Sequence, residues 1–268
     1  MTFLLLHTNQ SKIMTNKIYI FILFFFGLTV RCAAQIEEGR YEFWREDTKL
    51  TYDMFQGDTA GMSHFNQEYN IKSVISTGLW GVLDVPKKKR DWKTKPEKPY
   101  FCAAMDKTES FFLEKNDMSL KHAKLLWDIC ELSTRVARKS LENIVHQMDS
   151  IGYHTQISSK GINVYEHDTL NHIKSTGLIS LFYMTALNDG REFGKGLTGA
   201  FMHDVVIPKN DSLYYEYRKN IDRLLDETKE FATSEEDIRR FMTDTPLQGY
   251  IRATQLLDDQ KNRGEIRY

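Results

Sequence analysis

The sequence lacks several features that would assign a function directly. Its 268 residues carry 36 lysines and arginines against 37 aspartates and glutamates, so bulk electrostatics give no reason to expect nucleic acid as a partner. No internal repeat or low-complexity segment is present in the sequence, which excludes repeat architectures. The apolar run at residues 18–30 has 13 residues, fewer than the roughly 20 that cross a bilayer. We therefore predict no transmembrane segment in the mature chain.

The N-terminal region has the order of a secretory signal. Two lysines precede the apolar run and small residues follow it, which is the pattern of a basic region, an apolar region and a cleavage site. We predict a signal peptide at residues 1–34, with Met1 or Met14 as the start, and an exported protein in the periplasm or outside the cell. The alternative is a lipid anchor through Cys32, although Arg31 fits poorly before a lipid-modified cysteine.

Residues 117–151 have the strongest helical pattern in the chain. Apolar side chains recur at steps of three and four residues, which predicts one buried face about seven turns long. Asp117 or Ser119 can cap the start of this helix, and Gly152 follows its expected end. The residues of the apolar face are Ala123, Leu126, Ile129, Cys130, Val136, Ala137, Leu141, Ile144, Val145 and Met148.

Cysteine is scarce, because only Cys102 and Cys130 remain after the signal is removed. An exported chain reaches a compartment where disulfides persist, so these two residues can form one bridge between the long helix and the segment before it. Two free, buried thiols are the alternative. Nothing in the sequence around either cysteine indicates a nucleophile.

The segment before the helix reads as strands and turns. Aromatic and β-branched residues predict strands at residues 41–44, 69–83 and 100–105. Between the last two strands, residues 86–96 are strongly basic. We predict an exposed hairpin tip here. The alternative is a surface for anionic lipid or polymer, where each cation contributes about 1 kcal/mol.

The region after residue 152 has a weaker pattern. Residues 153–208 show no sustained period and contain four histidines, His154, His167, His172 and His203. His167 and His172 are five residues apart and so do not share a helical face. Residues 194–199 read as G-x-G-x-x-G, but a dinucleotide site needs this motif between a strand and a helix. Because Asn-Asp-Gly precedes the motif, we predict a flexible turn.

Helical signals return near the C-terminus. Asp211 can cap a helix that continues to Phe231, and Thr233 with Glu236 resembles a capping box. Thr245-Pro246 predicts the start of a last helix that ends near Asn262, since proline is tolerated at the first helical position. This region is expected to pack on the same core as the strands and the long helix.

Three segments resemble, in order, a bacterial family of secreted zinc-dependent protease-like domains of unknown function. Residues 50–57 resemble the family's opening L-T-W-x-D-F-x-G, with the aspartate one place early, and residues 102–112 resemble the strand that precedes its helix. The helix aligns with H-E-Q-x-H-F-D-I-x-E-L. The matching positions are His122, Asp128, Ile129, Glu131, Leu132, Arg138 and Lys139. The resemblance covers residues 44–150, and a charged helix near residues 214–231 resembles one downstream in the family.

The resemblance implies a zincin-like helix that has lost its chemistry. In H-E-x-x-H the two histidines bind zinc, and the glutamate acts as general base on the metal-bound water. Here Ala123 stands at the glutamate position and Leu126 at the second histidine position. The metal positions that transfer are His122, as first ligand, and Glu131, as a flanking acid. No catalytic residue is therefore assigned.

Two functions remain open after this comparison. The first is a secreted, non-catalytic protein that binds a peptide, a polysaccharide or an envelope protein, without a cofactor. The second is an active metal-dependent hydrolase whose zinc is held by His122, Glu131 and one or more of the four later histidines. In both, the expected fold is α+β: a small antiparallel sheet packed on the long zincin-like helix across residues 35–150, and a helical C-terminal region across residues 151–268.

Overall fold

The computed structural model describes residues 39–59, 63–150, 153–158, 161–166 and 178–262. The predicted signal peptide with Cys32, as well as Gly152, His167 and His172, lies outside these residues. The chain divides into two compact units, one of residues 37–253 and one of residues 1–36 with 254–268. The described part of the smaller unit belongs to α7 (Ala253–Asn262). Within the described ranges, no helix has the length and apolar character to cross a membrane.

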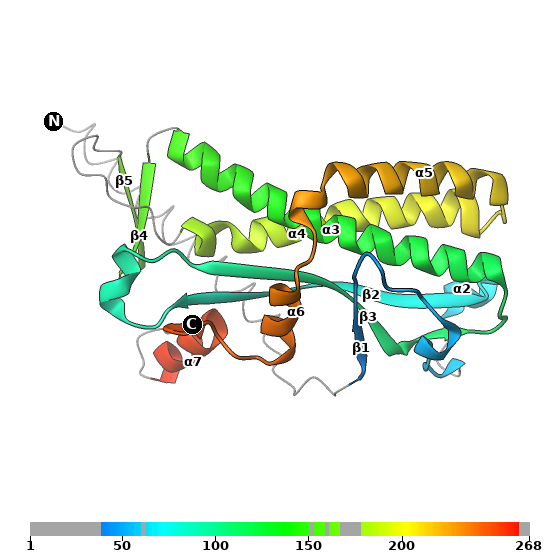
Figure 1. The fold of residues 1–268 in the computed structure, drawn as a ribbon, viewed down its shortest axis with the longest axis horizontal. Coiled ribbons are helices and arrows are strands. Elements are labelled where there is room, and N and C mark those ends of the chain that lie inside the picture. Colours follow the sequence, from blue (N-terminus) through cyan, green and yellow to red (C-terminus); the bar gives the residue numbers. More distant parts are fainter. Residues whose placement is uncertain (1–38, 60–62, 151–152, 159–160, 167–177, 263–268) are drawn as a thin grey trace, which may run out of the picture. The chain divides into compact units, whose positions relative to one another are not determined.

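The larger unit is built on a four-stranded antiparallel sheet, in the order β1-β3-β2-β6. The long strands β2 (Ser73–Pro86) and β3 (Lys98–Phe112) form a hairpin, flanked by β1 (Tyr41–Phe43) and β6 (Tyr250–Arg252) (Figure 1). The three strands expected from the sequence are present. The short β6 occupies a segment for which we predicted helix, so the last helix begins at Ala253 and not at Pro246.

The basic segment at the tip of the hairpin forms a short 3-10 helix, η3 (Lys89–Lys93). Residues 87–90 are exposed, as predicted for this tip. Trp92 is different, because its side chain is only 3% exposed and its indole Nε1 donates to the carbonyl oxygen of Pro86 at 2.6 Å. One buried aromatic ring thus anchors the tip to the end of β2.

The long helix α3 (Asp117–Ser150) agrees with the predicted range. Its cap differs from our prediction, because the Asn116 side chain, and not Asp117 or Ser119, accepts the hydrogen bond from the Ser119 amide at 2.8 Å. One face of α3 packs on the sheet through Ala123, Trp127 and Cys130. A second face, Leu125, Ile129 and Leu132, packs on the helices that follow. The helix therefore contributes to two hydrophobic clusters.

The remaining elements complete an α+β fold, which confirms the predicted class. Two short helices, η1 (Tyr52–Met54) and α2 (His64–Glu68), precede β2, and the hairpin β4 (Tyr153–Ser158) and β5 (Gly161–Glu166) follows α3. The C-terminal region is helical. Its elements are α4 (Leu178–Phe201), the π-helical turn η4 (Met202–Val206), α5 (Asp211–Glu227), η5 (Lys229–Phe231) and α6 (Glu235–Met242).

The caps of the C-terminal helices lie one residue away from their predicted positions. Asn210, and not Asp211, caps α5 by accepting from the Leu213 amide. In α6 the capping box is formed by Ser234 and Asp237, so Thr233 is free to make a different contact, described below. The α6 helix packs on the sheet face opposite α3, where Ile238 joins Phe43, Cys102 and Ala104.

The predicted turn at residues 194–199 was wrong, because these residues lie inside α4. Glycine is needed where α4 crosses α3: a Cβ on Gly190 or Gly194 would clash with Ser133, and one on Gly190 would also lie 3.0 Å from the Cβ of Ala137. Glycine therefore serves close helix packing here. The motif also lacks the strand, turn and helix order of a dinucleotide site.

We expect opposite effects from two glycine substitutions in α4. Gly190→Ala should destabilise the protein by about 1–3 kcal/mol, because the added methyl group overpacks the helix crossing. Gly196→Ala is the matched control, since its Cβ would meet open space, and it should stabilise the protein by up to about 1 kcal/mol through helix propensity. Urea unfolding measures both. Equal effects would contradict the close packing of α3 and α4.

Candidate functional site

His122, the position of the first zinc ligand in the resemblance, lies in an aromatic environment. Its imidazole contacts Phe201 edge-on at 5.5 Å and Tyr214 at 5.4 Å between ring centroids. Its Nε2 is buried and has no hydrogen-bond partner among the described residues. Burial lowers the pKa of the imidazole, and the charge of Asp211 opposes only part of that shift. These contacts are those of a histidine packed between helices.

The two positions that would complete H-E-x-x-H are filled by packed apolar side chains. Ala123 is 2% exposed and lies in the cluster between α3 and the sheet, with Trp44, Met105 and Trp127. Leu126 packs on the other side of α3, against the cluster that contains Phe201 and Tyr214. The glutamate position therefore faces the hydrophobic core of the sheet, among apolar and aromatic side chains.

Glu131 is fully buried and is bound by protein groups on both oxygens. Its Oε1 accepts from Arg135 Nε at 2.8 Å and from the Thr233 amide at 2.9 Å, and its Oε2 accepts from Thr233 Oγ1 at 2.6 Å. Thr233 follows η5, so this carboxylate ties α3 to the segment that leads into α6. Glu131 thus has a structural partner for each oxygen.

His122 and Glu131 do not come together. They are nine positions apart on α3, which places them on opposite sides of a helix with 3.6 residues per turn. His203 is exposed, and its Nδ1 lies 2.8 Å from a carboxylate oxygen of the adjacent Asp204. His154 lies on β4. In the described part of the chain, no group of three or more histidine, cysteine or acidic side chains has the arrangement of a metal site.

Cys102 and Cys130 are both free thiols in the structure. Cys102 lies on the α6 side of the sheet, whereas Cys130 packs from α3 on the other side. The sheet thus separates the two sulfur atoms, and of our two alternatives it is the pair of buried thiols that the structure contains. Burial raises the pKa of Cys102 well above its usual value and that of Cys130 to about 12, so neither is a ready nucleophile.

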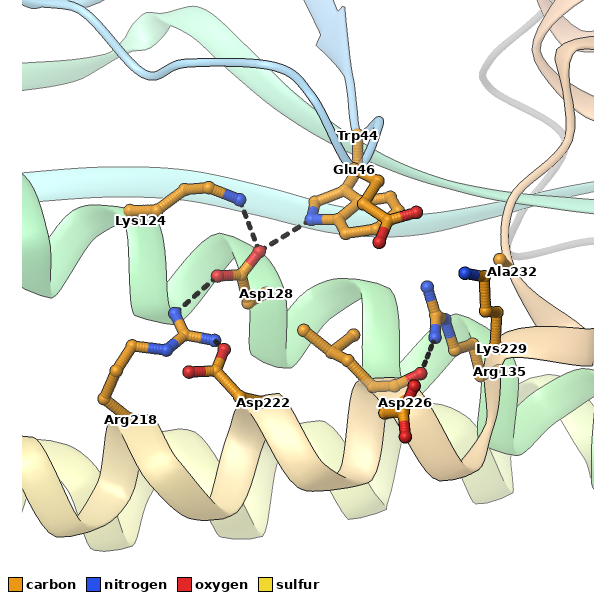
Figure 2. Close-up of a pocket in the computed structure, with 11 residues that line it drawn as sticks. Trp44, Glu46, Lys124, Asp128, Arg135, Arg218, Asp222, Asp226, Lys229 and Ala232 are labelled. Carbon is orange, nitrogen blue, oxygen red and sulfur yellow. Dashed lines mark hydrogen bonds and ion pairs between the residues drawn. The ribbon is translucent and has the colours of Figure 1, made fainter.

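Asp128, the other acid of the resemblance, lies at the centre of a charged network. Its carboxylate accepts from the Trp44 indole at 2.7 Å, from Lys124 at 2.6 Å and from Arg218 at 2.6 Å. Arg218 comes from α5 and also pairs with Asp222. Figure 2 shows these groups along one side of a hollow of about 640 Å³ between α3 and α5. We call it the Asp128 hollow.

A second concavity, the β2 groove, lies between β2 and α4 and has a volume of about 700 Å³. Two cations of α4, Arg191 and Lys195, border it, and none of the residues that line it is acidic. Hydroxyl groups and glycines make up much of the remainder. The lining residues are Ile75, Ser76, Thr77, Gly78, Leu79 and Trp80 of β2, Ile129, Cys130 and Ser133 of α3, and Arg191, Gly194, Lys195, Thr198 and Gly199 of α4.

The β2 groove borders a strand edge that is unpaired over most of its length. Only residues 84–86 of β2 pair with β6, and β3 is the one partner that the described residues provide for the rest. The Ser76 amide donates to Ser110 Oγ on the β3 side at 2.9 Å, whereas the Lys87 amide donates to Gly249 on the β6 side at 3.0 Å. Main-chain groups alternate sides along a strand. Those of Thr77 and Leu79 therefore point away from β3, to the open edge.

Neither concavity could be predicted from the sequence. The Asp128 hollow combines residues near 44, 124–135 and 218–232, and the β2 groove combines β2 with a helix that carried no clear periodic signal. Of the residues that line them, Asp128 and Ile129 were matched by the resemblance, Cys130 was named as a possible disulfide partner, and Gly194 and Gly199 belonged to the motif predicted as a turn. Arg191 and Lys195 are four residues apart, so they share one face if residues 178–201 form a helix. Recognition of that helix would have indicated a basic face there.

The geometry of the chain thus places two concavities beside α3, on which Ala123 and Leu126 pack into two different hydrophobic clusters. In comparisons with known proteins, no family model, no curated protein and no solved structure matches this chain.

Proposed function

We propose that this chain is an exported, non-catalytic relative of the zinc-protease-like family, and that it binds extended acidic peptides by strand addition at the open edge of β2. The observation that carries the proposal is the main chain at Thr77 and Leu79, which points away from β3 and pairs with no other described strand, next to a groove bordered by Arg191 and Lys195. An extended peptide that pairs with this edge gains main-chain hydrogen bonds, and its alternate side chains enter the groove.

The non-catalytic part rests on α3. Peptide hydrolysis by a zincin needs a metal held by paired imidazoles and a glutamate base. Ala123 and Leu126 occupy the corresponding positions and are packed into two different hydrophobic clusters. The scaffold beside the groove is therefore suited to hold a peptide without cleaving it.

The preference for acidic peptides follows from charge. Arg191 and Lys195 are exposed, no ion pair within the described ranges engages either of them, and no carboxylate lines the groove to repel an acidic ligand. Opposite charges across an interface favour association and set specificity more than they raise affinity. A basic peptide of the same length would face two like charges at short range.

Binding of two synthetic peptides tests the proposal. We expect an acetylated hexapeptide of alternating valine and glutamate to bind at least about tenfold more tightly than its valine and lysine counterpart, measured by fluorescence anisotropy at low salt. Lys195→Glu should weaken binding of the acidic peptide by about five- to tenfold. Lys139→Glu, an exposed lysine of α3 outside the groove, is the matched control and should leave binding unchanged.

Two further measurements separate strand addition from simple charge attraction. N-methylation of every second amide of the acidic peptide should abolish binding in one register and spare it in the other, because only alternate amides face β2. Mass spectrometry should recover the peptide intact. Equal loss in both registers would contradict strand pairing, and chelator-sensitive cleavage would contradict the non-catalytic assignment.

A further inference from the structure

One guanidinium nitrogen of Arg135, in the Asp128 hollow, is not bonded to any residue that the structure describes. Arg135 is a buried residue of α3, with 4% of its side chain exposed. Its Nε donates to Glu131 at 2.8 Å, its Nη1 donates to the carbonyl oxygen of Leu225, and its guanidinium carbon lies 5.2 Å from the centroid of the Trp44 ring. No hydrogen bond to another described residue is made by Nη2. Figure 2 shows this nitrogen pointing into the hollow.

The charges of the hollow fall into two groups. At one end, Lys124, Asp128, Arg218 and Asp222 are joined to one another by ion pairs. At the other end, Glu46, Asp226 and Lys229 line the hollow beside Arg135, and none of these three has an ion pair within the part of the chain that the structure describes. This end thus offers the Lys229 ammonium, the carboxylates of Glu46 and Asp226, and the Nη2 donor of Arg135, whose Nε already pairs with Glu131.

We infer that the Asp128 hollow binds a free amino acid as its zwitterion. The ligand carboxylate would accept from Arg135 Nη2 and pair with Lys229, since a guanidinium nitrogen is a strong donor to a carboxylate. The ligand ammonium would pair with Asp226 and Glu46. Leu225 and Ala232, which also line the hollow, favour an aliphatic side chain. This site is separate from the β2 groove and does not depend on peptide binding there.

A matched set of three small molecules tests the inference by titration calorimetry. We expect leucine to bind with a Kd below about 10 mM, and at least about fivefold more tightly than N-acetyl-leucine or leucinamide. N-acetyl-leucine keeps the carboxylate and lacks the ammonium, whereas leucinamide keeps the ammonium and lacks the carboxylate. The dipeptide Gly-Leu places the two charges farther apart and should bind more weakly than leucine.

Variants of exposed residues assign each charge without disturbing the fold. Lys229→Ala should weaken the binding of leucine and of N-acetyl-leucine by about three- to tenfold and leave the binding of leucinamide unchanged. Asp226→Asn should weaken the binding of leucine and of leucinamide and leave the binding of N-acetyl-leucine unchanged. Lys219→Ala, an exposed lysine of α5 outside the hollow, is the control. Arg135→Lys, checked for folding by circular dichroism, should remove binding because lysine lacks the second nitrogen of the fork.

Several results would overturn the inference. These are the absence of leucine binding at about 10 mM, equal affinities for leucine and its two half-charged analogues, or an effect of Lys229→Ala no larger than that of Lys219→Ala. Binding of Gly-Leu as tight as that of leucine would assign the hollow to a peptide terminus and would overturn the free amino acid as ligand.

Discussion

Replacing Glu131 by alanine should destabilise the protein by about 3–5 kcal/mol, the cost of breaking a buried charge pair by removing one partner. The change leaves the Arg135 guanidinium, which is almost fully buried, without the carboxylate that accepts from its Nε. It also leaves the amide and hydroxyl of Thr233 without an acceptor. Urea unfolding followed by tryptophan fluorescence measures the loss.

Glu142→Ala is the control for this experiment. Glu142 lies on the same helix and is exposed, so its removal should change the free energy of unfolding by no more than about 0.5 kcal/mol. Thr233→Ala should lower the free energy of unfolding by about 1 kcal/mol, a loss between those of the other two variants, since it removes one side-chain hydrogen bond. If Glu131→Ala were as mild as Glu142→Ala, the carboxylate would not be the tie between α3 and the segment before α6.

Restoring the zinc-protease motif should damage the protein and not revive it. In Ala123→Glu, a carboxylate enters the cluster between α3 and the sheet, where Trp44, Met105 and Trp127 surround it. Burial of an unpaired carboxyl should lower the free energy of unfolding by roughly 3–5 kcal/mol at neutral pH. Burial also raises the pKa of such a carboxyl, so the loss should shrink as the pH falls toward the ordinary glutamate pKa of about 4.3.

The double variant Ala123→Glu with Leu126→His carries the complete H-E-x-x-H sequence. We expect it to bind no stoichiometric zinc, measured by mass spectrometry of metals on the purified protein, because both histidines would lie among packed aromatic side chains and the described residues bring no third ligand to them. Lys121→Glu places a glutamate at an exposed position two residues earlier on α3 and should be nearly neutral in its effect on stability. A stable double variant with one zinc ion per chain would show that the catalytic geometry had been retained.

The sequence predicted those elements whose signal is local and repeated. The face of α3 was readable because its apolar residues keep a helical spacing over many turns, and the strands β2 and β3 because β-branched and aromatic residues gather in them. The caps were placed one to three residues away, since Asn116, Asn210 and Ser234 compete with neighbouring polar residues that can cap equally well. Such choices are decided by backbone geometry.

Two of the elements that the sequence did not predict, α4 and β6, were missed because tertiary contacts override their composition. Four glycines between residues 190 and 199 read as a turn, yet Gly190 and Gly194 are what lets α4 approach α3. The strand β6 has three residues and follows a proline, so its pairing with the end of β2 decides its conformation. Buried Asp84 also secures this region, since it pairs with Arg252 and accepts from the Leu247 amide at 2.7 Å. No local pattern encodes these contacts.

The candidate sites were less accessible to sequence reasoning than the fold. The resemblance drew attention to His122 and Glu131, which the structure places in packing and structural roles. The Asp128 hollow depends on Trp44, Arg135 and Lys229 meeting across long sequence separations. Open strand edges are likewise a property of sheet order and not of any one strand.

The positions of the two thiols bear on where the protein can fold. With one sulfur on each side of the sheet and both deeply buried, the native state requires no oxidant to form and no reductant to persist. The described part of the chain can thus reach its native topology in a reducing or an oxidising environment, because no disulfide between these two cysteines has to form. The fold of residues 37–253 is in this sense independent of the redox conditions that meet it.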